Sequence, residues 1–173
     1  MDYSFFAYIQ KMELIGFFSG YPLIYAAIYF FTGRKPIKNI FINKISLFLP
    51  TGYALVGTLY LGLQLKNLYP DYSIETISQA FYQPILICYA LLSLLFWIPA
   101  IARKTILSLL HSIVFFYFIL KDLFVQIFAI SADWNILSND FKLYNDSMLL
   151  NLGAFAIIVL INYLLFRFKK NKS

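Results

Sequence analysis

The sequence predicts an all-α, polytopic membrane protein, a bundle of five transmembrane helices that forms a single integral membrane domain. Of its 173 residues, 61% are hydrophobic and only 13% are charged, whereas soluble domains are about 45–50% apolar and about 25% charged. Five segments have the length and apolarity to cross a hydrocarbon core, which takes about 20 helical residues. The charged residues between these segments also separate by sign. Together these observations indicate a chain that threads repeatedly through a bilayer.

The predicted spans leave little of the chain outside the membrane. They cover residues 14–33, 45–65, 76–102, 105–128 and 147–166. We expect residues 1–13 to form a short outer tail or interfacial turn, and residues 129–146 to form the longest loop. Arg103 and Lys104 leave a very short turn between the third and fourth spans, which predicts an antiparallel hairpin there.

Small residues predict where helices approach one another closely. Gly16 and Gly20 lie four positions apart in the first span, and Ala54, Thr58 and Gly62 lie along one face of the second. Small side chains at this spacing let two helix backbones come close together. For the glycine pair, packing within the bundle and a seam between two copies both fit the pattern.

Five crossings would place the two signs of charge on opposite sides. One side then carries ten basic residues and no acid: Arg34, Lys35, Lys38, Lys44, Arg103, Lys104, Arg167, Lys169, Lys170 and Lys172. The other side carries all eight acids and four lysines: Asp2, Glu13, Asp71, Glu75, Asp122, Asp133, Asp140 and Asp146, with Lys11, Lys66, Lys121 and Lys142. Because Lys and Arg near helix ends are retained in the cytoplasm, we expect the amino terminus outside and the carboxyl terminus in the cytoplasm.

The net charge of +6 therefore follows from topology and indicates no nucleic-acid partner. The basic inner side instead favours contact with anionic membrane lipids. A bias toward Ile, Phe, Tyr, Asn and Lys is typical of AT-rich bacterial genomes, so we expect the bacterial inner (cytoplasmic) membrane.

Motifs for chemistry are missing from the sequence. Cys88 is the only cysteine, which excludes an intrachain disulfide and a site built from several cysteines. There is no H-E-x-x-H sequence, no glycine-rich phosphate loop and no metal-ligand spacing. We expect no catalytic residue, no metal site and no evident cofactor, and hence no catalysis by this chain alone.

Ionisable groups inside a span are costly unless they are paired or hydrated, so each is a functional candidate. His111, the sole histidine, could titrate, bind a ligand or bridge helices through a hydrogen bond. It belongs to a helical stripe that we expect to face the bundle: Ser108, His111, Phe115, Phe118, Asp122 and Gln126.

Polar residues near the outer ends of three spans are candidate ligand-binding residues together with His111. If their helix faces converge, they would line a polar vestibule that opens to the outside. These residues are Gln64, Lys66, Gln83, Lys121, Asp122 and Gln126. For Lys121 and Asp122, the alternative is mutual or interhelical pairing.

The last four spans resemble the DoxX-like family of small bacterial membrane proteins, over residues 45–166. The similarity is carried by Leu61-Gly-Leu-Gln-Leu-Lys-Asn-Leu-Tyr-Pro70, the Ala102-Arg103 turn and Leu149-Leu-Asn-Leu-Gly-Ala154. An additional helix precedes this unit, and Tyr89-Ala-Leu-Leu-Ser93 stands where many relatives carry an acid. The resemblance implies a four-helix bundle, sometimes a small subunit of a quinone-linked redox system.

Three functions fit these observations. The first is a scaffold or accessory subunit of a membrane complex, with a membrane-protein partner or a homo-oligomer. The second is binding or transport of a small apolar or amphipathic molecule through the vestibule. The third, implied by the resemblance, is a quinone-linked redox subunit.

Overall fold

The computed structural model describes residues 3–33, 45–69, 84–128 and 134–171, and these residues are helical apart from short connections. The all-α class is therefore confirmed. In chain order the elements are α1 (Tyr3–Phe18), α2 (Tyr21–Gly33), η1 (Ile45–Phe48), α4 (Leu49–Leu68), α6 (Pro84–Leu91), η2 (Leu92–Trp97), α7 (Pro99–Ala102), α8 (Thr105–Phe128) and α9 (Trp134–Asn171).

Among the described residues, four helical stretches are long and apolar enough to cross a membrane. They are Gln10–Phe31, Ile45–Leu68, Thr105–Val125 and Ser138–Lys169. A shorter apolar stretch, Pro84–Trp97, lies within the third predicted span. Composition and length thus support a multi-pass membrane protein built around four long apolar stretches.

The first predicted span, residues 14–33, is two helices rather than one. α1 already begins at Tyr3, where we expected a tail, and the chain turns at Ser19 and Gly20 before α2 starts at Tyr21. Pro22 lies in the first turn of α2, where its missing N–H costs no intrahelical hydrogen bond. The chain therefore breaks at Gly20, two residues before the proline.

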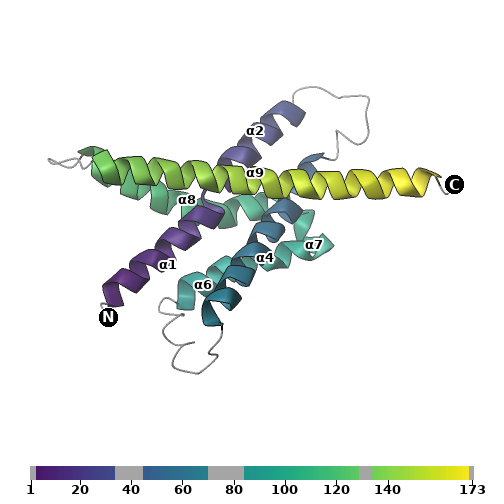
Figure 1. The fold of residues 1–173 in the computed structure, drawn as a ribbon. Coiled ribbons are helices and arrows are strands. Elements are labelled where there is room, and N and C mark those ends of the chain that lie inside the picture. Colours follow the sequence, from purple (N-terminus) through teal and green to yellow (C-terminus); the bar gives the residue numbers. More distant parts are fainter. Residues whose placement is uncertain (1–2, 34–44, 70–83, 129–133, 172–173) are drawn as a thin grey trace.

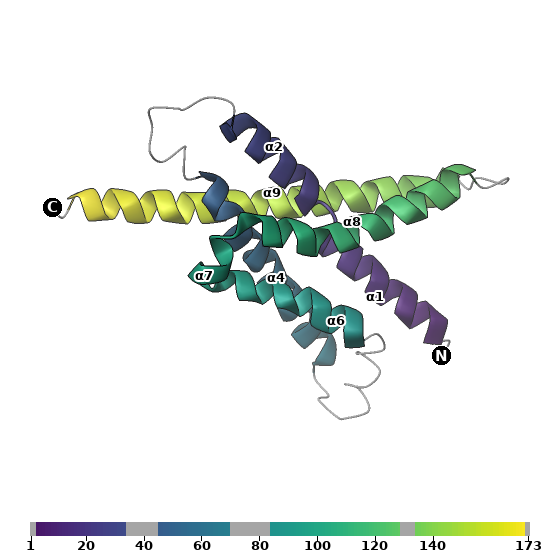
Figure 2. The same ribbon diagram turned by 180° about the vertical axis from the view of Figure 1, so that it is seen from behind.

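The third predicted span, residues 76–102, is also interrupted. Its first residues lie outside the described part of the chain, and the rest forms α6, η2 and α7. Ile98 is extended, with ψ of 119°, because a residue before proline is pushed out of the helical region. From α7 the chain turns directly into α8, and the antiparallel hairpin predicted there is visible in Figure 2.

The last helix is much longer than predicted. α9 has 38 residues and begins at Trp134, so most of the loop expected at residues 129–146 is helical. Polar residues lower the hydropathy of residues 134–146, but this segment contains neither Gly nor Pro to end a helix. At about 1.5 Å per residue, α9 is about 57 Å long.

The helices are arranged as a crossing. α8 runs antiparallel along α9, while α1 and α2 on one line and α4 on another pass across α9 (Figures 1 and 2). At the crossing, the core is rich in aromatic side chains. Phe18, Tyr53, Tyr60 and Phe115 are fully buried there, and Phe18 packs against the other three rings at centroid distances of 4.9–5.6 Å.

The predicted glycine pair packs against α9 of the same chain. A Cβ added at Gly20 would lie 2.4 Å from the backbone nitrogen of Met148, and one at Gly16 would lie 3.1 Å from the Leu143 side chain. Only a glycine lets the two backbones come this close at position 20. Of the two readings of this pair, the described contacts match packing within the bundle.

The small-residue face predicted on α4 is only partly a helix contact. Ala54 is buried, but Thr58 and Gly62 are exposed, and a Cβ at Gly62 would meet nothing within 4 Å. The close approaches occur at two other glycines. Gly52 lies against Phe155 of α9, and Gly57 lies against Ser93 of η2. These glycines are five positions apart, so α4 is packed from two sides.

Candidate functional site

His111 lies at the centre of the crossing with both ring nitrogens in hydrogen bonds. Its Nε2 is 2.7 Å from the backbone carbonyl oxygen of Tyr89, and its Nδ1 is 2.7 Å from the Tyr53 hydroxyl. A carbonyl can only accept, so Nε2 carries the proton and donates it. In the neutral imidazole, Nδ1 is then the acceptor and the Tyr53 hydroxyl donates to it. Both ring nitrogens of His111 therefore have partners on other helices.

Aromatic rings enclose this imidazole. The Tyr89 ring stacks on it at a centroid distance of 4.4 Å and an interplanar angle of 9°, and the Tyr89 hydroxyl donates to the His111 backbone carbonyl. Tyr53 and Phe96 meet the imidazole edge-on. His111 therefore joins α8 to α4 and α6. Of the three roles that the sequence leaves open, the interhelical bridge is the one that these contacts match.

The stripe predicted on α8 faces the bundle. Ser108, His111 and Phe115 are buried, Phe118 and Asp122 are partly buried, and the side chain of Gln126 lies outside the described residues. Toward the start of α8, Ser108 donates to the Thr105 carbonyl and lies 2.8 Å from the Tyr21 hydroxyl. This hydroxyl contact ties α2 to α8.

Side chains of α9 form hydrogen bonds with backbone groups at the break between α1 and α2. The Gly20 N–H donates to Ser147 Oγ at 2.8 Å, and Asn151 Nδ2 donates to the Phe17 carbonyl at 2.8 Å. A helix end leaves such backbone groups without intrahelical partners, and a membrane interior offers no water in their place. Ser147 and Asn151 thus let the first span be discontinuous inside an apolar bundle.

The polar residues of the predicted vestibule meet α1. Gln64 Nε2 donates to Glu13 at 2.9 Å, and Lys11 is paired with Asp122 at 2.6 Å. Lys11 and Glu13 are two positions apart, so their side chains leave α1 in nearly opposite directions. Gln64 and Asp122 therefore lie against different sides of α1.

The other vestibule candidates are placed differently. Lys66 and Lys121 are exposed. Gln83 lies outside the described residues, as does the side chain of Gln126. Asp122 is held by interhelical pairing, as one alternative proposed, but its partner is Lys11 on α1. The sequence interpretation missed Lys11 and Glu13 because it assigned both residues to a tail. Lys11, Leu14 and Phe18 follow spacings of three and four positions, and this helical pattern could have indicated α1.

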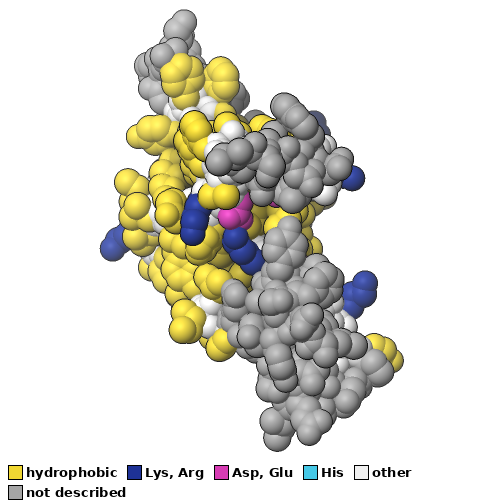
Figure 3. All heavy atoms as spheres, turned by 90° about the vertical axis from the view of Figure 1, so that its left-hand side faces the viewer, with side chains coloured by type: hydrophobic (Ala, Val, Ile, Leu, Met, Phe, Trp, Pro, Cys, Tyr) yellow, Lys and Arg dark blue, Asp and Glu magenta, His cyan; other side chains and the backbone are white. Residues whose placement is uncertain are grey.

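Acidic and basic side chains gather around the ion pair of Lys11 with Asp122. Figure 3 shows some of them together near the middle of the face, next to hydrophobic surface. Asp140 of α9 is buried and lies within electrostatic range of Asp122 and Lys11. Within the described ranges, no three His, Cys, Asp or Glu side chains are grouped so that they could hold a metal ion.

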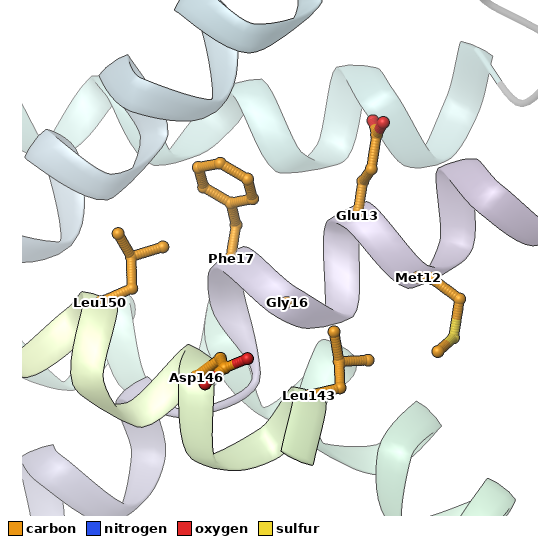
Figure 4. Close-up of a pocket in the computed structure, with 7 residues that line it drawn as sticks. All are labelled: Met12, Glu13, Gly16, Phe17, Leu143, Asp146 and Leu150. Carbon is orange, nitrogen blue, oxygen red and sulfur yellow. The ribbon is translucent and has the colours of Figure 1, made fainter. Parts of the chain in front are cut away.

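A groove lies between α1 and α9 (Figure 4). It has a volume of about 400 Å³. Its walls are mainly hydrophobic; Asp146 extends between the two helices, whereas the Glu13 side chain points away from α9 (Figure 4). The lining residues are Met12, Glu13, Gly16, Phe17, Leu143, Asp146 and Leu150.

In the part of the chain that the structure describes, these observations define a helical protein with four apolar stretches long enough to span a membrane. It has one buried histidine enclosed by aromatic rings and an open groove between α1 and α9. Comparison with known proteins found no matching family model, no matching curated protein and no matching solved structure.

Proposed function

We propose that this chain is a five-crossing protein of the bacterial inner membrane, with its amino terminus outside and its carboxyl terminus in the cytoplasm. The arrangement of the helix ends supports this topology. The amino end of α1, the carboxyl end of α4, the carboxyl end of α8 and the amino end of α9 lie toward the left and bottom of Figure 1, whereas α2 and α9 end toward the top and right. The acid-rich ends thereby lie apart from the basic ends.

Labelling of single cysteines tests the topology. In a Cys88→Ser background, Asn139→Cys and Lys104→Cys place thiols at exposed positions of opposite ends. A membrane-impermeant maleimide should label Asn139→Cys in intact cells and Lys104→Cys only after permeabilisation. The reverse pattern would invert the proposed orientation.

We further propose that the protein acts as a scaffold or accessory subunit of a membrane complex. The observation that carries this proposal is how little of α8 and α9 the chain covers, since only 22% of each apolar window is buried. In α9, Tyr163, Leu164, Leu165, Phe166 and Phe168 are all exposed. Near-consecutive positions cover the whole circumference of a helix, so this end of α9 offers an apolar surface on every side.

Meanwhile, the polar groups inside the bundle hold its helices together. His111, Ser147 and Asn151 each bond across helices, which leaves the lipid-facing side of α8 and α9 to packing interactions. Helix association in a membrane is driven by such packing. The carboxyl end of α9 is therefore the surface that we assign to a partner helix.

Site-specific photo-crosslinking tests this assignment in native membranes. A photoreactive residue at Leu165 should give a discrete higher-mass protein adduct, whose mass distinguishes a second copy from another protein. The matched control is the same probe at Ile158, which is buried in the same helix and should give no intermolecular adduct. Lipid adducts alone from position 165 would overturn the proposal.

A further inference from the structure

The groove between α1 and α9 has hydrophobic walls and one carboxylate, that of Asp146, directed between the two helices (Figure 4). Glu13 belongs to the apolar stretch Gln10–Phe31, and Asp146 belongs to Ser138–Lys169. Figure 4 shows Asp146 between the two helices, with Phe17 and Leu150 nearby. A ligand that matches these groups needs a positive charge next to an apolar portion.

The charged side chains of α1 near the groove are bonded within the chain, while Lys142 and Asp146, four positions apart on α9, are both exposed. Lys11, the basic residue of α1 closest in sequence, is paired with Asp122, and Glu13 is bonded to the neutral amide of Gln64. Asp146 is exposed at the groove. Attraction between opposite charges is stronger beside apolar surface than in water. An ammonium group should therefore bind more strongly at Asp146 than at a carboxylate surrounded by water.

The size of the groove selects the kind of ligand. One turn of a helix, about 10 Å across and about 5.4 Å high, fills roughly 420 Å³. This volume already equals the volume of the whole groove, about 400 Å³. A partner helix would therefore engage it with less than one turn. A lipid headgroup with the first part of its acyl chain fits a groove of this volume, because small-molecule pockets begin at about 300 Å³.

We propose that this groove binds a membrane lipid whose headgroup carries a primary ammonium. The ammonium lies at Asp146 and donates hydrogen bonds to its carboxylate. The upper acyl chain packs on Phe17, Leu143 and Leu150. This inference goes beyond the accessory-subunit proposal, because it concerns the other end of α9.

Native mass spectrometry of the delipidated full-length protein tests the proposal. The probe is an equimolar mixture of phosphatidylethanolamine, phosphatidylcholine and phosphatidylglycerol with identical acyl chains. The ethanolamine lipid should be bound in preference to the choline lipid, which has the same charge but no N–H donor. Asp146→Asn should reduce the bound ethanolamine lipid by about fivefold, the upper range for one partly exposed ion pair.

Two variants separate charge at the groove from charge elsewhere. Asp146→Glu keeps the carboxylate and should keep the preference, and Asp122→Asn removes one charge at the same end of the molecule but outside the groove lining and should also keep it. Equal binding of the three lipids, or unchanged binding by Asp146→Asn, would overturn the proposal. The proposal would also be overturned if the delipidated chain formed a dimer and bound no lipid.

Discussion

Two hydrogen bonds hold His111 between three helices, and both lie in the aromatic core. Its replacement by leucine would leave the Tyr53 hydroxyl and the Tyr89 carbonyl without these partners. An unsatisfied buried group costs about 1–3 kcal/mol. We therefore expect His111→Leu to lower the free energy of unfolding by at least that amount, measured by thermal or denaturant unfolding in detergent micelles.

Leu110 provides the matched control for this variant. It is the neighbour of His111 but is 56% exposed, so Leu110→Ala should change the free energy of unfolding by less than about 0.5 kcal/mol. Equal stability of the His111→Leu and Leu110→Ala proteins would contradict the bridging role. A quinone-linked role stays a prediction, and normal quinone-dependent electron flow in His111→Leu would remove its support.

At the residue scale, the sequence identified His111 but not its partners. A lone ionisable residue in an apolar segment is conspicuous because burial is costly. Tyr53 and Tyr89 are two of 14 tyrosines, and which of them reaches His111 depends on how three helices pack side by side. That register is a property of the assembled bundle. No local pattern encodes it.

Two glycines give opposite predictions at the element scale. Alanine at Gly20 would place its Cβ 2.4 Å from the Met148 backbone, which forces α9 away from the break. Overpacking of this kind costs about 1–3 kcal/mol. Gly20→Ala should therefore lower the unfolding temperature in detergent.

Gly62 is the control, because open space surrounds the position of its missing Cβ. It lies in the interior of α4, where alanine is favoured over glycine by about 1 kcal/mol. Gly62→Ala should leave stability unchanged or raise it. A larger loss in Gly62→Ala than in Gly20→Ala would contradict the packing described for both helices.

The early start of α9 also has a direct test. Asn145 is an exposed residue in the interior of the helix, so proline there should cost about 3 kcal/mol by removing a backbone hydrogen bond and clashing with the preceding turn. Asn145→Ala should be nearly neutral in the same unfolding measurement. If residues 134–146 formed a loop, both variants would be tolerated alike.

The elements themselves show what apolarity can and cannot predict. It located α4 and α8 closely, since each consists of one uninterrupted apolar run. It missed the start of α9, because polar residues such as Asn139 and Asp140 lower hydropathy without disfavouring a helix in this setting. The break at Gly20 had a local signal in Ser-Gly-Tyr-Pro, but the same residues also fit a packed, kinked helix.

At the scale of the whole molecule, the apolar stretches are longer than a typical bilayer is thick. The four candidates contain 21–32 residues, or about 31–48 Å of helix, against a hydrocarbon core of about 30 Å. Such mismatch is relieved by tilt or by a thicker bilayer. The steep crossing of α1, α2 and α4 over α9 is consistent with strong tilt (Figure 1).

Bilayer thickness should therefore change the stability of the protein. We expect a higher unfolding temperature in nanodiscs of monounsaturated lipids with 20-carbon chains than in those with 14-carbon chains, with the headgroup held constant. The thick bilayer covers more of the exposed surface of α9. Greater stability in the thinner lipid would contradict this arrangement of the spans.

The break between α1 and α2 also has a consequence for how the protein is made. Its two polar contacts come from Ser147 and Asn151, which follow their partners by 127 and 134 positions in the chain. During synthesis, the first segment enters the membrane long before the last helix exists. Until α9 arrives, the Gly20 amide and the Phe17 carbonyl lack these partners, so assembly of the first segment can be completed only at the end of translation.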